Sequence, residues 1–282
     1  MKRMWALILI VLIATGCATA PVSGRTQLMM MPISADEEMG QQAFAQLLSA
    51  YGKKGKLIDP KTADATEQKY LQRVRQVGTR ILDATGWRKE YPWKWTYAVI
   101  RDDTVNAGMF PGGKMVVYTG MLNFAKDDDE LAAVIGHEMG HAIARHGPER
   151  VSQVTLAEVG LATLGAALET NQYGPLITAA AGLGAQVGVL LPFSRTHEEE
   201  ADYIGVLAMA KAGYDPRAAI RLWTRMEQKH GSGGPEFLST HPNPGTRVKN
   251  LEELLPYALT LRQNPSLPLP KTREELPNLL KP

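Results

Sequence analysis

The residues most able to do chemistry lie between Leu131 and Gly147, where the sequence reads LAAVIGHEMGHAIARHG. On an α-helix, residues four apart project from nearly the same face, so His137 and His141 present two imidazoles that can hold one zinc ion. Glu138 is turned by about 100° around the helix axis and can reach a water molecule at the metal, the position of a general base. The spacing predicts a zinc site for hydrolysis, and an amphipathic core helix with polar residues is the alternative.

A catalytic zinc needs a third protein ligand, and the segment SRTHEEEAD at residues 194–202 offers several. Glu198 and Asp202 are four residues apart and can face the first helix together. Glu198 would then complete the ligand set, while Asp202 would orient a ligand histidine through its second ring nitrogen. Because three carboxylates are adjacent, spacing alone leaves the ligand open. The candidates are Glu198, Glu199, Glu200 and His197.

Residues 1–17 have the pattern of a bacterial lipoprotein signal. Lys2 and Arg3 precede an apolar run from Met4 to Ile13, and small residues then lead to Cys17. The apolar run is too short to span a bilayer comfortably as a permanent helix. We therefore predict that the signal is removed and that Cys17 is lipidated. An ordinary signal peptide or a short membrane anchor is the alternative.

Removal of this signal changes the charge and the redox chemistry of the chain. The chain has 31 basic and 29 acidic residues, and the loss of Lys2 and Arg3 makes the two counts equal. Such a balance gives no basic surface for nucleic acid. Cys17 is the only cysteine, so its lipidation would exclude disulfides. We expect a periplasmic protein held at a membrane by lipid, and Ala18 favours the outer membrane by the usual bacterial sorting rule.

Helical spacing of apolar residues predicts the elements that precede the site. The first helix covers about 34–51 and begins with a capping-box signature, Ser34 followed by Glu37. The second covers about 64–84. Acidic residues at 127–129 suit the N-terminus of the metal helix. We expect the first two helices to be scaffold.

The sequence patterns that predict strands lie between these helices and the metal helix. Residues 93–100 alternate with a period of two, and the turn Pro111-Gly112-Gly113 predicts a hairpin within 105–119. The strand that leads into the metal helix is a candidate for the edge that holds an extended peptide by main-chain hydrogen bonds. An internal strand with no substrate role is an equal alternative.

Two further segments are predicted from composition. Residues 175–193 carry no charge and are rich in alanine and glycine. We expect helices packed near the active site, with a true membrane span as the less favoured alternative. Prolines from residue 259 to the end interrupt any helical pattern, so 259–282 is expected to be an extended tail. Residues 18–33 show little periodicity and are expected to be a tether.

The sequence HEMGH followed by SRTHEEEAD resembles the zinc endopeptidases that include the HtpX heat-shock protease, the CAAX prenyl protease and the mitochondrial Oma-type protease. In that family the third ligand is the Glu of an E-x-x-x-D motif, which corresponds to Glu198, and the Asp corresponds to Asp202. The likeness covers about residues 20–258 and includes NAGMFPGGKMVVYTGML at 106–122 and PVSGRTQL at 21–28. The multi-spanning helices of the prenyl-protease branch are absent, so the chain resembles the soluble periplasmic branch.

The resemblance also extends to a C-terminal element, Ser239-Thr240-His241-Pro242 followed by Arg247. It implies that His241 lies beside the zinc, where it would stabilise the oxyanion or occupy the open coordination position. It implies that Arg247 holds an acidic neighbour or a substrate carbonyl. The alternative is a His-Pro turn that caps a last helix at 247–255. His146 and His230 are expected at the surface.

Together these patterns predict a zincin-like α+β metalloprotease domain at 34–258, mostly helical and binding one zinc ion. The predicted activity is hydrolysis of misfolded or stalled envelope proteins by zinc-activated water, with Glu138 as the base. A chaperone or assembly factor for outer-membrane proteins, using the same cleft, is one alternative. A zinc hydrolase acting on cell-wall material is another, although the sequence contains no carbohydrate-site pattern.

Overall fold

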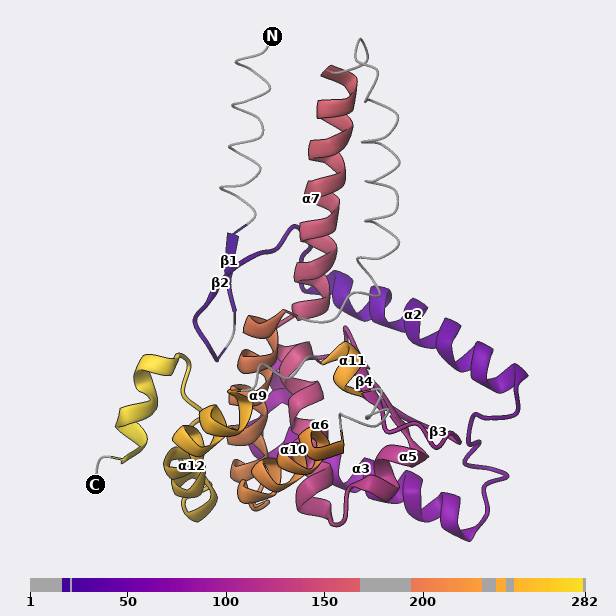
Figure 1. Ribbon diagram of the computed structural model, residues 1–282, viewed down its shortest axis with the longest axis vertical. Helices are drawn as coiled ribbons and strands as arrows, with labels where there is room; N and C mark the ends of the chain where they lie inside the picture. The colour runs from indigo at the N-terminus through magenta and orange to yellow at the C-terminus, as the bar shows by residue number, and fades with distance from the viewer. Residues whose placement is uncertain (1–16, 21, 168–193, 230–236, 242–245, 281–282) are drawn as a thin grey trace.

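The computed structural model describes residues 17–20, 22–167, 194–229, 237–241 and 246–280. Figure 1 shows helices gathered around α6, with a small sheet on one side and α7 projecting from the body. The prediction of a mostly helical α+β fold is confirmed. In chain order the described elements are β1 (Cys17–Thr19), β2 (Thr26–Leu28), α2 (Ser34–Lys53), α3 (Ala65–Thr85), α4 (Trp87–Glu90), β3 (Thr96–Ile100), β4 (Ala107–Phe110), β5 (Lys114–Tyr118), α5 (Thr119–Phe124), α6 (Asp128–Ile143), α7 (His146–Ala167), α9 (Arg195–Lys211), α10 (Arg217–Lys229), α11 (Phe237–Thr240), α12 (Arg247–Gln263) and the 3₁₀-helix η2 (Arg273–Leu280).

Helices α6 and α9 form the centre of the fold and cross at unusually close range. A Cβ atom added to Gly205 of α9 would lie 2.6 Å from the backbone nitrogen of His137, and one added to Gly140 of α6 would lie 2.7 Å from the carbonyl oxygen of Ala201. Only glycine permits this backbone approach. The glycines therefore bring the face of α6 that carries the HExxH residues against the face of α9 that carries Glu198.

The three-stranded sheet has the order β3-β5-β4, with β3 parallel and β4 antiparallel to β5. Met115 and Val117 of β5 pack into the main helical core, while Val116 and Tyr118 face a second cluster with Phe44 of α2. The hairpin predicted around Pro111 is present. The strand that leads toward the metal helix, β5, is central, so the proposed edge role is wrong for it. The edge strand of this sheet beside the site is β4.

Helix starts differ in part from the predicted caps. Asp127 caps α6 by accepting a hydrogen bond from the backbone N–H of Glu130, as the acidic residues there predict. The capping box expected at Ser34 is absent, because Glu37 instead accepts from Lys114 Nζ at 2.6 Å and from the backbone N–H of Lys94 at 2.8 Å. These contacts fix the start of α2 against the sheet.

Two segments expected to be irregular have regular structure. Within the predicted tether, β1 and β2 form an antiparallel hairpin in which Cys17 pairs with Leu28. Within the predicted extended tail, α12 continues to Gln263 and η2 follows, with Leu276 buried in the core. Prolines did not prevent this, because Pro256 lies inside α12 and Pro277 inside η2. Tertiary packing outweighed the local helix-breaking signals.

Several predictions concern residues outside the described ranges: the signal before Cys17, the apolar segment 175–193, and His230. Among the described helices, none combines the length and apolar character that a membrane-spanning helix needs.

Candidate metalloprotease site

Side chains from α6, from α9 and from the residue that follows α11 converge on one point where α6 crosses α9. His137, His141, Glu198 and His241 each offer a ligand atom, and these atoms all lie within 4.8 Å of one another. The Nε2 atoms of His137 and His141 are 3.1 Å apart, and Glu198 places Oε2 3.3 Å from the first and Oε1 3.3 Å from the second. All four residues are buried. Imidazole and carboxylate are ligands that zinc prefers, so the donor set suits this ion.

The spacing of these atoms also fits a tetrahedral zinc ion. Bond lengths of about 2.0–2.1 Å place tetrahedral ligand atoms about 3.3 Å from each other. The three distances above agree with that value. Among the described residues, the buried Oε2 atom of Glu198 and Oε1 atom of Glu138 have no hydrogen-bond partner. A buried carboxylate oxygen that accepts no hydrogen bond is costly, and a cation at this point would compensate it.

His241 lies at the fourth corner of this group. Its Nδ1 atom is 3.2 Å from His137 Nε2 and 3.0 Å from Glu198 Oε1. The ring stacks on Phe237 of α11, with centroids 4.2 Å apart and planes at 13°. Of the roles that the family resemblance implies for His241, this geometry favours the open coordination position. It does not favour the alternative of a turn that only caps α12.

Glu138 lies next to the four ligand groups and faces a cavity. Its Oε1 atom is 3.5 Å from Nε2 of His241. Burial raises the pKa of the Glu138 carboxyl. The carboxylate lines a cavity of about 450 Å³ that also touches β4 and α2. A base at this position can reach both a water molecule at the metal group and a ligand in the cavity.

The outer nitrogen of His137 contacts a carboxylate. Asp202 Oδ1 is 2.9 Å from His137 Nδ1 and 2.6 Å from Arg247 Nη2, so it accepts hydrogen bonds from both. The Arg247 guanidinium stacks 3.5 Å from the ring centre of Trp223 and is 1% exposed. Its Nη1 atom is 3.5 Å from Glu198 Oε2. Of its two expected roles, the structure favours holding acidic neighbours, because Arg247 lies behind the metal group.

The outer nitrogen of His141 contacts a second histidine instead. Its Nδ1 atom is 2.8 Å from Nδ1 of His146, whose Nε2 atom is 3.0 Å from Glu200 Oε2. If His141 uses Nε2 for a metal, its Nδ1–H donates to His146, which must then be neutral and donate through Nε2 to Glu200. Burial lowers the pKa of His146 to about 4, which keeps the ring neutral near pH 7. The expectation of a surface position for His146 is wrong, since it is fully buried.

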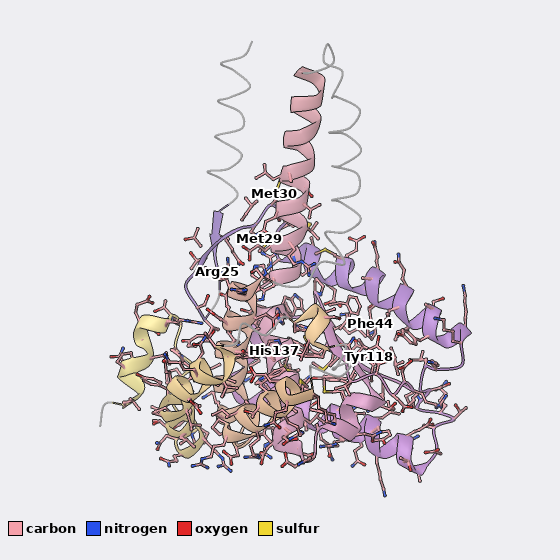
Figure 2. All side chains as sticks on the ribbon, viewed as in Figure 1. Arg25, Met29, Met30, Phe44, Tyr118 and His137 are labelled. Atoms are coloured by element: carbon pink, nitrogen blue, oxygen red, sulfur yellow. The ribbon has the colours of Figure 1, made fainter. Side chains whose placement is uncertain are left out.

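The N-terminal hairpin supplies the next contacts outward from His146. Arg25 donates to Glu200 Oε2 at 2.7 Å and to Glu149 Oε2 at 2.6 Å, and Ser23 also donates to Glu200. His197 lies 3.0 Å from Glu149 Oε2. Burial alone would raise the pKa of Glu149, but the hydrogen bonds from Arg25 and His197 lower it to about 2. Figure 2 labels Arg25 where the hairpin meets the base of α7, above His137 in that view.

This arrangement distinguishes among the candidates for the third ligand. Glu198 joins the metal group, whereas Glu200 and His197 belong to the network around Arg25. Glu199 is half-buried and lines a separate cavity of about 570 Å³ between α9, α12 and η2. Sequence reasoning missed Ser23, Arg25 and Glu149. The only signal for Ser23 and Arg25 was the PVSGRTQL segment, to which the sequence alone assigned no role, and Glu149 had no signal.

Comparison with known proteins agrees with this geometry. A sequence profile described as Peptidase family M48 matches residues 68–255, more than half of the chain. Mitochondrial metalloendopeptidase OMA1 of Schizosaccharomyces pombe is 36% identical over 246 residues, which cover 86% of this chain and 68% of that protein. The human Metalloendopeptidase OMA1, mitochondrial, is 31% identical over 273 residues, covering 92% of this chain and 50% of the relative.

A bacterial relative is more distant. Beta-barrel assembly-enhancing protease of Yersinia pestis is 28% identical over 162 residues, which cover 55% of this chain and 33% of that protein. The chain therefore spans half or less of the length of two of these three relatives. The profile match and the OMA1 similarities, together with the histidine and glutamate ligand set, show that the chain belongs to peptidase family M48 and is a zinc-dependent metalloendopeptidase of the Oma and HtpX type.

Proposed function

We propose that Glu138 is the general base of this endopeptidase and that His137, His141 and Glu198 hold its zinc ion. The observation that carries the proposal is the position of Glu138. Its buried Oε1 atom has no hydrogen-bond partner among the described residues, lies beside the metal group and faces the cavity along β4. A proton acceptor between a metal site and an open cavity is what hydrolysis of a bound peptide requires.

The roles of the remaining residues follow from their contacts. When bound, zinc supplies Lewis acidity toward the scissile carbonyl and acidifies water. Glu138 receives the proton of the attacking water and passes it to the leaving amine. Asp202 and the buried Arg247 behind it fix the ring of His137. Because His241 lies at the fourth corner, water can enter that position only if the ring moves away.

Substitution of Glu138 by Gln tests this proposal. The change keeps size and polarity but removes the basic carboxylate, so we expect one zinc per chain and a loss of peptide hydrolysis of about 10³-fold. Metal analysis and digestion of an unfolded protein such as casein measure the two quantities. Glu199→Gln is the matched control, because Glu199 lies on α9 next to Glu198 but outside the metal group. Retained proteolysis in a pure Glu138→Gln preparation would exclude Glu138 as the base.

The cellular setting that we propose is the bacterial envelope, with a lipid on Cys17 and misfolded or stalled envelope proteins as substrates. The signal pattern before Cys17 supports the lipid, and the name of the Yersinia pestis relative supports an envelope role. The OMA1 relatives are mitochondrial by name, so the setting depends on the signal. Metabolic labelling with a fatty acid, compared between wild type and Cys17→Ser, measures lipidation. Absence of label in the wild type would contradict it.

A second candidate is an assembly factor for outer-membrane β-barrels that uses the same cleft without obligatory cleavage. The relative named for enhancing β-barrel assembly favours this candidate. Complementation of a deletion strain with the Glu138→Gln variant separates the two. Rescue would indicate a binding function, and failure by a variant that is present at wild-type level would indicate proteolysis.

A further inference from the structure

One cavity connects directly to the proposed base. It has a volume of about 450 Å³ and lies between α2, strands β4 and β5, and the start of α7, with Glu138 and His241 among its lining residues. Its far wall is one stripe of α2, formed by Met39, Ala43 and Leu47, which are spaced four residues apart and so share a helix face. The cavity is therefore continuous with the hydrolytic site.

The wall formed by α2 is fixed at both ends. At its start, Asp36 accepts two hydrogen bonds from Arg145, at 2.7 and 2.8 Å. One turn later, Gly40 packs so closely that an added Cβ atom would lie 1.7 Å from the carbonyl oxygen of Pro111. Farther along, the ring of Tyr51 meets that of Tyr118 edge to face at 5.8 Å. These contacts fix how α2 lies over the sheet, against which Phe44 of the same helix also packs.

Two small residues keep the space between the fixed points open. Ala43 projects into it from α2, and Gly108 of β4 borders it from the opposite wall. A Cβ atom added to Gly108 would meet only Val116, at 3.9 Å, so that side of the strand borders open space. Larger residues at these two positions would fill the cavity.

The chemistry of the lining selects the occupant. Apolar side chains dominate it, among them Met39, Leu47, Phe110 and Val116, while the half-buried Arg150 is a charged lining residue and Glu138 and His241 belong to the reaction site. The volume exceeds the roughly 150 Å³ that accommodates a benzene ring in a protein interior. No other strand in the described part of the chain pairs with the outer edge of β4, and a peptide added there would direct alternate side chains to one face.

We propose that this cavity is the specificity pocket of the protease and takes a large apolar side chain, such as leucine, methionine or phenylalanine, of a substrate residue that flanks the scissile bond. The proposal rests on the assignment of the hydrolytic site to Glu138. It makes α2 the specificity helix, with Ala43 setting the depth of the pocket. Unfolded proteins expose such apolar side chains, whereas folded proteins bury most of them.

Filling the pocket tests the proposal. The probes are short alanine- and glycine-rich peptides that differ only in one central residue: alanine, leucine or phenylalanine. Wild-type protein should cleave next to the phenylalanine with a kcat/KM about 10-fold or more above that of the alanine peptide. Ala43→Leu should reduce this ratio to near 1, and Gly108→Val should do so from the opposite wall. Ala45→Leu, an exposed position on the same helix, should keep the wild-type ratio.

A binding measurement separates failure of the pocket from failure of the catalytic assignment. Fluorescence anisotropy with the same labelled peptides and the Glu138→Gln protein should show preference for phenylalanine, lost when Ala43→Leu is added. If neither the wild type nor any variant cleaves the peptides but the binding preference for phenylalanine is present, the assignment of the hydrolytic site fails and the pocket proposal stands. The pocket proposal would be overturned if Ala43→Leu and Gly108→Val both kept the preference for phenylalanine. The two variants must then be folded, with circular dichroism and melting temperature like those of Ala45→Leu.

Discussion

The two histidines of α6 contact the same metal group but have different outer partners. His137 donates to Asp202, a carboxylate that is held by the buried guanidinium of Arg247. His141 contacts His146, which is neutral near pH 7 and donates to Glu200, a carboxylate that also accepts from Arg25. A carboxylate partner makes the ligand imidazole more basic, and a neutral imidazole does so much less. The residues that support His137 therefore act on their ligand more strongly by electrostatics than the residues that support His141.

The two sets of supporting residues also differ in where they lie along the chain. The support of His137 comes from α9 and α12, elements that themselves build the core around the site. The support of His141 begins in a hairpin at the N-terminus, 120 residues or so earlier in the sequence, and is completed by α7. The comparison suggests that Asp202 sets zinc affinity, whereas Arg25 mainly links the hairpin to the helices near the site.

Removal of Asp202 should give the largest change in this comparison. In Asp202→Ala, His137 loses its hydrogen-bond acceptor, and the buried Arg247 loses the closer of its acidic partners. We expect zinc affinity to fall by about 100-fold, the upper end of what outer-partner substitutions cause. Competition with a chromogenic chelator measures the affinity. Glu199→Ala on the same helix should have no effect, and an equal loss in that control would show that α9 is merely disturbed.

Substitution of His146 should have a smaller effect on the metal. His146→Phe keeps a ring that can stack on His197, whose centroid lies 4.3 Å away, but removes the acceptor for His141 Nδ1–H. Because the lost partner is a neutral group, we expect zinc affinity to fall by about 10-fold. His197→Phe keeps a ring stacked on His146 and leaves His141 its acceptor, so it should change zinc affinity by less than about 2-fold. A loss greater than that of Asp202→Ala would reverse the proposed ranking.

The predictable part of the site consists of residues related by helical spacing. His137 and His141, and likewise Glu198 and Asp202, are four apart on single helices, and local geometry alone places each pair on one face. The family resemblance then singled out Glu198 among adjacent carboxylates. The structure brings Glu198 into the metal group, because the glycines at the α6–α9 crossing allow the two faces to meet.

The unpredictable part depends on departures from regular structure and on long-range contacts. In a continuous helix, His146 would be turned about 140° away from His141. Instead the helix is interrupted at Arg145, which has a positive φ of 59°, and α7 begins at His146 with its ring against His141. The link from Arg25 to Glu149 spans 124 residues, a distance over which periodicity carries no information. The central position of β5 likewise depends on a pairing with β3 that alternation does not specify.

The smallest expected effect is on the acid stability of the network around Arg25. Hydrogen bonds from Arg25 and His197 lower the pKa of Glu149 from 4.5 to about 2, so the folded state holds this proton less tightly than the unfolded chain does. The stabilisation is therefore complete above about pH 4.5 and is lost as the pH falls toward 2. Because Arg25 is partly exposed, we discount the full linkage energy to about 2 kcal/mol.

Arg25→Gln should remove most of this contribution. Denaturant unfolding of wild type and variant, followed from pH 7 to pH 3 with a chelator present so that metal release does not contribute, should give curves that converge as the solution becomes acidic. Arg88→Gln removes an exposed pair with Asp83 and should lower stability by less than about 1 kcal/mol at every pH. If the free energies of unfolding of Arg25→Gln and wild type instead differ by the same amount at every pH, the hairpin is held by packing rather than by its charge. In that case the support of His141 would end at Glu200, and the hairpin would have no electrostatic link to the metal site.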